Sequence, residues 1–80
     1  MHYVYLIKSI NYLDQVYVGY TTDVEQRLQT HNEGSSAHTA KYKPWKLHAY
    51  FAFEDKELAL AFEKYLKSHS GRAFASKRFW

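Results

Sequence analysis

The sequence has no cysteine among its 80 residues, and this absence removes two common ways of stabilising a small chain. Disulfide bonds and zinc sites with thiolate ligands are both excluded, so a hydrophobic core has to stabilise the fold alone. A chain without cysteine is compatible with a reducing compartment, and we expect a cytoplasmic location.

Glycines are also few, and neither a long apolar run nor a leader pattern is found in the sequence. The three glycines do not cluster, which excludes a phosphate-binding glycine loop. No apolar segment approaches the roughly 18 residues that span a bilayer, so no membrane partner is expected. The start, MHYVYLIKSINYLD, has neither a basic leader nor a small-residue cleavage site. We expect one domain over residues 1–80.

Aromatic and aliphatic residues are abundant, and their pattern predicts three strands. Hydrophobic residues make up 46% of the chain and aromatics 19%, enough for a compact core. The segments HYVYLIKSI and VYVGY predict a hairpin, since the turn-favouring stretch NYLDQ separates them. The segment WKLHAYFAF, directly after Pro44, predicts a third strand.

Two helices are predicted between and after these strands. Thr22 and Glu25 form a capping-box pattern, which predicts a helix to about Asn32 and then a polar loop, GSSAHTAKYKP. Asp55 is expected to cap a second helix that ends at Gly71. Its predicted core face consists of Leu58, Ala61, Phe62, Tyr65 and His69. The end, RAFASKRFW, is expected to form a short helix or a docked tail.

These elements predict an α+β fold, a three-stranded antiparallel sheet flanked by helices in the order β-β-α-β-α plus a C-terminal helix or tail. The net charge is +3, and most of the positive charge lies in the second half, interleaved with aromatic residues. This composition suits DNA phosphates and stacked bases, and it equally suits lysines that cover the edges of an aromatic core. The candidate phosphate contacts are Lys41, Lys43, Lys46, Lys67, Arg72, Lys77 and Arg78.

Polar residues border the predicted apolar helix faces. Arg27 and His31 are one turn apart, and each taken alone is typical of a surface arginine or a helix-terminal histidine. Glu63 lies at the edge of the second helix's apolar face. It can hold a hard cation together with waters and substrate phosphate, or it can pair with Lys67. The five histidines show no zinc-ligand spacing.

The predicted strands carry tyrosines on shared faces. Tyr3 and Tyr5 lie on one face of the first strand, and Tyr17 and Gly19 on one face of the second. Strand tyrosines are usually packing residues, whereas a glycine within a strand often marks a close approach.

Five motifs follow one another along the chain: Tyr3–Val4–Tyr5, Tyr17–Val18–Gly19, RLQTHN, HTAKYKPWKL and AFEKYLK. Together they resemble the GIY-YIG nuclease family over about residues 3–70. The similarity is greatest to small stand-alone members related to the nuclease domains of bacterial excision repair and phage homing endonucleases. The resemblance implies hydrolysis of DNA phosphodiester bonds with one divalent metal, Mg²⁺ or Mn²⁺. It also implies the family's fold, a three-stranded antiparallel sheet flanked by helices.

The resemblance also implies roles for five residues. Tyr5 would be the general base, directly or through a relay with His31, and Tyr17 would orient water or phosphate. In this site, Gly19 would leave room beside Tyr17 for a phosphate to approach. Arg27 would bind nonbridging phosphate oxygens, and Glu63 would bind the metal. A free tyrosine has a pKa near 10, so a base role for Tyr5 calls for nearby cations that favour the phenolate.

The sequence departs from the family pattern in three ways. Tyr3 stands where the first motif has glycine, and valine replaces isoleucine in both motifs. The asparagine that the family commonly carries after the glutamate is missing from GRAFASKRF, where Ser76 is a candidate substitute. A weak or inactive nucleic-acid-binding module is therefore the alternative to an enzyme. A third reading is an interaction domain or homodimer that uses Phe79 and Trp80, and sequence specificity could come from a protein partner.

Overall fold

A computed structural model describes all residues 1–80, and it confirms the predicted α+β architecture. The central strand β1 (His2–Ser9) pairs antiparallel with β2 (Val16–Thr21) on one side and with β3 (Trp45–Phe53) on the other. The sheet order is therefore β2-β1-β3, and the first two strands form the predicted hairpin. No helix is long and apolar enough to cross a membrane.

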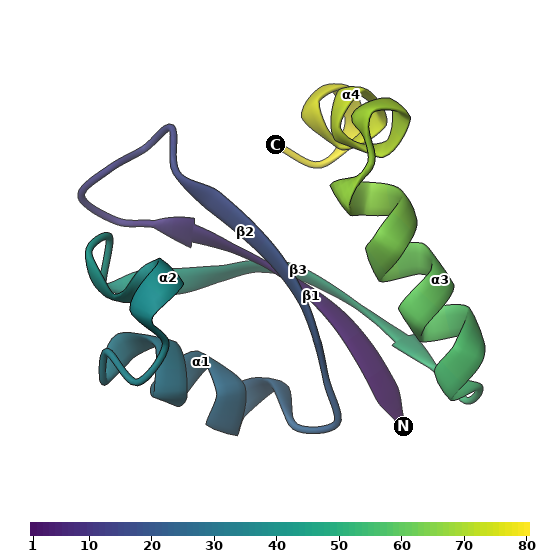
Figure 1. The fold of residues 1–80 in the computed structure, drawn as a ribbon, viewed down its shortest axis with the longest axis horizontal. Coiled ribbons are helices and arrows are strands. Elements are labelled where there is room, and N and C mark those ends of the chain that lie inside the picture. Colours follow the sequence, from purple (N-terminus) through teal and green to yellow (C-terminus); the bar gives the residue numbers. More distant parts are fainter.

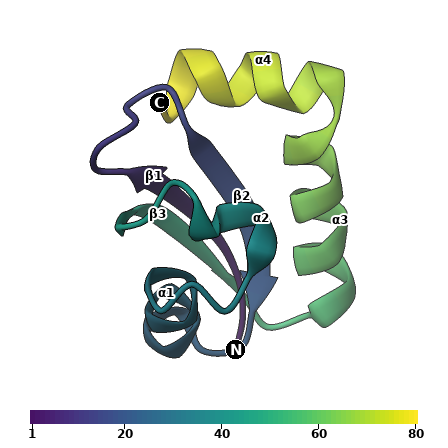
Figure 2. The same ribbon diagram turned by 60° about the vertical axis from the view of Figure 1, so that its left-hand side comes forward.

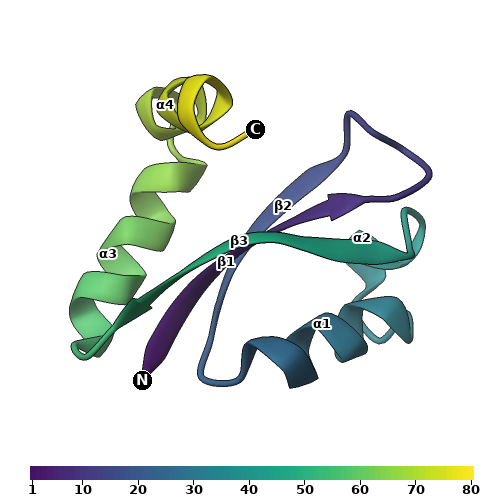
Figure 3. The ribbon, with the colours of Figure 1, turned by 180° about the vertical axis from the view of Figure 1, so that it is seen from behind.

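Four helices cover the sheet from two sides (Figures 1 and 3). Helix α1 (Val24–Asn32) and the short α2 (Ala37–Ala40) lie on one face. Helix α3 (Lys56–Lys67) lies on the other face beside β2, and α4 (His69–Arg78) runs across the C-terminal end of α3 (Figure 2). Because strand side chains alternate, β1 serves two cores: Val4 and Leu6 face α3, while Tyr5 and Ile7 face α1.

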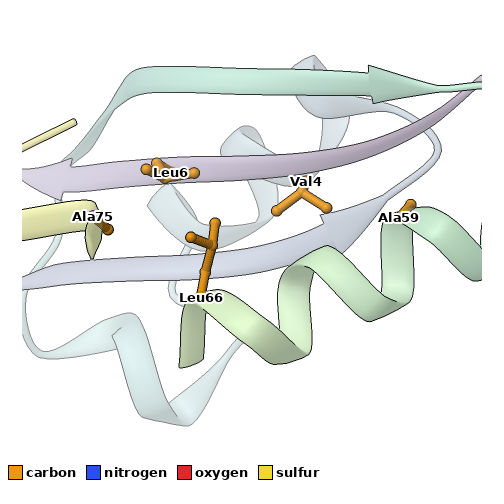
Figure 4. Packing of buried hydrophobic residues seen from close by; sticks show 5 residues of the cluster. All are labelled: Val4, Leu6, Ala59, Leu66 and Ala75. Atoms are coloured by element: carbon orange, nitrogen blue, oxygen red, sulfur yellow. The ribbon is translucent and has the colours of Figure 1, made fainter. Parts of the chain in front are cut away.

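The core under α3 and α4 differs from the predicted helix face. Ala59 and Leu66 of α3 and Ala75 of α4 are the helix residues buried against Val4 and Leu6 of β1 (Figure 4). The predicted core residues Leu58, Ala61, Tyr65 and His69 are exposed, and only Phe62 packs against this cluster. Apolar residues occupy more than one face of this helix, and tertiary packing selects which face is buried. Tyr65 packs against Phe74 of α4 instead.

The helix boundaries bring three further corrections. Asp23, rather than Thr22, caps α1, because β2 continues through Thr21 and the carboxylate accepts from the Gln26 N–H at 3.0 Å. The predicted loop contains α2. The predicted second helix breaks at Ser68, whose extended backbone ends α3 and whose hydroxyl caps α4.

Gly71 does not end a helix, because it lies in the first turn of α4, where that helix crosses α3. A Cβ at this position would lie 1.7 Å from the backbone oxygen of Tyr65, so only glycine allows the two helices to approach this closely. The C-terminal segment expected as a short helix or a tail is thus the greater part of α4, a helix of 10 residues.

Candidate active site

Tyr5 lies at the centre of the sheet, on the face that α1 covers. Its side chain is almost fully buried, and it pairs across the strands with Gly19 of β2. A Cβ at Gly19 would lie 2.2 Å from the Tyr5 phenol oxygen and 2.4 Å from Cζ. The expectation that Gly19 leaves room for a phosphate beside Tyr17 is therefore wrong, because the Tyr5 ring fills that space.

Helix α1 brings Arg27 and His31 to the Tyr5 hydroxyl. The Nε of Arg27 donates to Tyr5 Oη at 3.4 Å, and Nε2 of His31 is hydrogen bonded to the same oxygen at 2.9 Å. His31 is fully buried, so it is not the exposed helix-terminal residue that its position alone suggests. Val24 and Leu28 hold the helix against the sheet by packing against the buried cluster that contains Tyr5.

Thr39 of α2 extends this series of hydrogen bonds. No motif in the sequence indicated a role for Thr39. Its Oγ1 lies 2.7 Å from Nδ1 of His31, and its hydroxyl donates to the Ser36 carbonyl at 3.5 Å. The indole of Trp45 donates to the Thr39 carbonyl at 2.9 Å, which fixes α2 against the start of β3. No pattern in the polar segment around Thr39 indicated that this hydroxyl would be buried.

Burial sets the protonation states of the two hydrogen-bonded groups. Desolvation raises the pKa of the Tyr5 phenol above its ordinary value of 10.0, and the hydrogen bond and charge of Arg27 oppose this rise without cancelling it. The expectation of a phenolate favoured by nearby cations is therefore not met. Desolvation, aided by the Arg27 charge, lowers the pKa of His31 below 6.5. Both groups are neutral at pH 7.

Three more polar side chains lie next to the hydrogen-bonded group of Tyr5, Arg27 and His31, namely Tyr17, Glu63 and Lys67. The Tyr17 ring centroid is 6.4 Å from that of Tyr5 and 5.3 Å from that of His31. From α3, the Lys67 ammonium lies 5.3 Å from the Tyr17 ring centroid and pairs with the Glu63 carboxylate at 2.9 Å. The Glu63 charge contributes to the raised pKa of Tyr5, so the carboxylate is within electrostatic range of the phenol.

The residues around Glu63 can be compared with the needs of a divalent cation. Its side chain is 20% exposed, and no group of three or more His, Cys, Asp or Glu side chains surrounds it. A zinc site is therefore not supported. A single accessible carboxylate suits Mg²⁺ or Mn²⁺, because such an ion keeps several waters and takes further oxygens from substrate phosphate. The Lys67 ammonium competes for the same carboxylate.

A cavity of about 660 Å³ opens beside Tyr17, between the hairpin, α3 and α4. Lys67 and Arg72 line it, as does Lys8, which the sequence analysis missed although it interrupts an apolar strand. A smaller cavity of about 160 Å³ is also lined by Tyr17 and includes Lys41. The structure does not bring the other predicted phosphate contacts to these cavities, although all are exposed: Lys43, Lys46, Lys77 and Arg78. Ser76 also lines the larger cavity.

Comparison with known proteins agrees with this geometry. The sequence profile described as the GIY-YIG catalytic domain matches residues 1–77. The UPF0213 protein SpyM3_1077 of Streptococcus pyogenes serotype M3 is 36% identical over 72 residues, which cover 89% of this chain and 76% of that protein. The UPF0213 protein HQ_3675A of Haloquadratum walsbyi is 37% identical over 70 residues, 86% of this chain and 76% of that protein.

A solved structure shows the same similarity in three dimensions. The solution NMR structure of the UPF0213 protein BH0048 from Bacillus halodurans superposes with a TM-score of 0.55 at 33% identity. The superposition covers 98% of this chain and 85% of that one. The GIY-YIG domain is nuclease-related and implies nucleic-acid binding. The profile, the relatives and the fold agree, and this chain belongs to the GIY-YIG family.

Proposed function

We propose that this chain is a metal-dependent endonuclease that hydrolyses DNA phosphodiester bonds, with residues 1–80 acting as one domain. The proposal rests on the Tyr5 hydroxyl, which is hydrogen bonded to Arg27 at 3.4 Å and to His31 at 2.9 Å. A buried phenol between a fixed cation and a neutral imidazole can transfer protons, and pure packing does not require that arrangement.

Water activation is assigned to a relay between Tyr5 and His31. The attacking water gives a proton to Tyr5 Oη while the phenol passes its own proton to Nε2 of His31. The raised pKa of Tyr5 and the lowered pKa of His31 keep both groups neutral beforehand, so a proton is present to move and a nitrogen is free to accept it. No free phenolate has to form, which removes the difficulty posed by the raised pKa.

The other residues stabilise and orient the phosphate. Arg27 uses one N–H on Tyr5 and has further donors for nonbridging oxygens, whose charge grows in the transition state. Tyr17 orients water or phosphate through its hydroxyl. A Mg²⁺ or Mn²⁺ ion bound through Glu63 would supply further charge neutralisation on the phosphate and the leaving oxygen.

The exposed cations supply affinity for DNA with little sequence information. Lys67 and Arg72 line the larger cavity beside Tyr17, where an entering strand would place its phosphates, and Lys41 lines the smaller cavity. Phosphate contacts of this kind do not read base identity. Branched or damaged DNA, or a protein partner, would then determine where the chain cuts.

The Glu63–Lys67 pair favours one alternative, a nucleic-acid-binding module without activity. A carboxylate beside DNA repels phosphate, and a module without metal therefore has to neutralise it. Lys67 does so at 2.9 Å. The absence of asparagine and glutamine after α3 points in the same direction.

A nicking assay with a binding assay distinguishes the two functions. Supercoiled, branched and single-stranded DNA are incubated with Mg²⁺, Mn²⁺ or chelator, and binding is followed by fluorescence anisotropy. We expect metal-dependent nicking that Glu63→Gln and Arg27→Ala abolish, while Glu63→Gln still binds DNA. Glu57→Gln, in the first turn of the same helix, serves as the matched control.

Two outcomes would change the assignment. Nicking that survives Glu63→Gln would refute the metal role of this carboxylate, and DNA binding without cleavage under every condition would support the module. Lys67→Met adds a measurement that does not depend on activity. Removing the competing ammonium should raise the affinity for Mn²⁺, measured by electron paramagnetic resonance, if Glu63 is the ligand.

A further inference from the structure

Both ring nitrogens of His31 have a partner, and this constrains its tautomer. Nε2 lies 2.9 Å from Tyr5 Oη, and Nδ1 lies 2.7 Å from Thr39 Oγ1. A neutral imidazole carries one proton, so one nitrogen donates and the other accepts. Only the tautomer protonated at Nδ1 leaves Nε2 free to accept a proton from Tyr5.

The surroundings of Thr39 favour that tautomer. The Thr39 hydroxyl has one proton, which it donates to the Ser36 carbonyl at 3.5 Å. A carbonyl only accepts, so while the hydroxyl donates to Ser36, its Oγ1 accepts from His31 and Nδ1 carries the proton. Thr39 is itself 1% exposed, and its carbonyl is held by the Trp45 indole, so the hydroxyl has little freedom to turn elsewhere.

The surroundings of Tyr5 favour the same tautomer independently. The guanidinium of Arg27 can only donate, and it donates to Tyr5 Oη. If Nε2 of His31 also donated, the phenol oxygen would accept twice and its own buried proton would have no acceptor, which costs about 1 to 3 kcal/mol. With Nε2 as acceptor, the Tyr5 hydroxyl, the Nδ1–H of His31 and the Thr39 hydroxyl each have an acceptor.

We infer that Thr39 is a positioning residue that holds His31 in the Nδ1-protonated tautomer, so that Nε2 receives the Tyr5 proton. The hydrogen bonds then run in one direction, from Arg27 through Tyr5 and His31 to Thr39 and the Ser36 carbonyl. The inference deepens the proposed function and rests on it only for its consequence for catalysis. The tautomer itself is a property of the free protein.

The test is the tautomer of His31 in the free protein, without DNA or metal. Long-range ¹H–¹⁵N correlation spectra distinguish a protonated from an unprotonated ring nitrogen, and His31→Gln identifies the His31 signals among the five histidines. We expect protonated Nδ1 in the natural protein and in Thr39→Ser, which keeps the hydroxyl. Thr39→Val should move the ring to the Nε2-protonated tautomer or to a mixture of the two.

Cleavage by the same variants gives the second readout. Thr39→Val should lower the nicking rate by about 100-fold, the lower end of what general acid–base catalysis contributes, and Thr39→Ser should restore it. If Thr39→Val does not fold, Thr39→Ala removes the hydroxyl without adding a methyl group beside the imidazole.

The inference is overturned if His31 in the natural protein is protonated at Nε2, or if removal of the hydroxyl leaves the tautomer unchanged. A protein with the expected tautomer and no nuclease activity would refute the proposed function alone. Nuclease activity in a protein with the opposite tautomer would refute this inference and the proton relay through Nε2, and it would leave the endonuclease activity itself standing.

Discussion

Gly19→Ala provides a direct test of how the sheet makes space for Tyr5. The added Cβ would lie 2.2 Å from Oη, 2.4 Å from Cζ and 2.8 Å from Cε1 of the Tyr5 ring. Ordinary carbon contacts begin near 3.5 Å, so the phenol has to retreat by about 1 Å. That displacement breaks the 2.9 Å hydrogen bond to His31.

The expected magnitude follows from these contacts. Overpacking of a buried site costs about 1 to 3 kcal/mol, and the lost hydrogen bond adds about 1 kcal/mol. We expect the free energy of unfolding in urea to fall by about 2 to 4 kcal/mol. Nicking should fall by about 100-fold, because a shift near 1 Å in a reacting group has an effect of that size.

The control is the same substitution in a Tyr5→Leu background. Leucine lacks the outer ring atoms that the new Cβ meets, so Gly19→Ala there should be neutral or stabilising by about 0.5 kcal/mol, through the entropy of the unfolded chain. An equal loss of stability in both backgrounds would refute the reasoning, since the clash with the phenol could not then be its cause.

Two further predictions concern His31 and Gly71. The pKa of His31 is lowered in the folded protein. As the pH falls through about 6.5, His31 takes up a proton in the unfolded chain but stays neutral in the folded protein, so the free energy of unfolding decreases. His31→Gln should therefore lose less free energy of unfolding than the natural protein between pH 7.5 and pH 5, and an equal loss in urea titrations would contradict the burial argument. Gly71→Ala places a Cβ 1.7 Å from a backbone oxygen, which cannot rotate away as a side chain can. It should lower the urea midpoint sharply while Ser70→Ala on the same helix does not; equal midpoints would show that the α3–α4 crossing can relax.

Most of the fold was predictable because the signals are local. Segments rich in aromatic and aliphatic residues predicted all three strands, and Asp55 was expected to cap α3 at the residue where it does. The errors fall where two local signals compete. Thr22 and Asp23 both suit a helix cap, and the continuation of β2 through Thr21 decides between them. Apolar residues lie on two faces of α3, and the sheet selects one.

The candidate site was predictable in its residue types and not in its connections. Tyr5, Tyr17, Arg27, His31 and Glu63 were singled out from motifs along the chain, and the structure gathers them around β1 and β2. Their contacts join residues far apart in sequence, such as Tyr5 and His31, 26 positions apart. No local pattern in the sequence indicates a contact between residues so far apart, and no local pattern indicated a role for Thr39.

The sequence by itself determined the order of the three strands and of the helices other than α2, the reliance on a hydrophobic core, and the resemblance to GIY-YIG nucleases. Periodicity and capping depend on near neighbours, and near neighbours are visible in a string of residues. Only the tertiary structure decided that Tyr5 and His31 are buried, that both are therefore neutral, and that Gly19 admits the Tyr5 ring. Desolvation, hydrogen-bond direction and steric contact depend on what the rest of the chain places around a group, and folding alone supplies those neighbours.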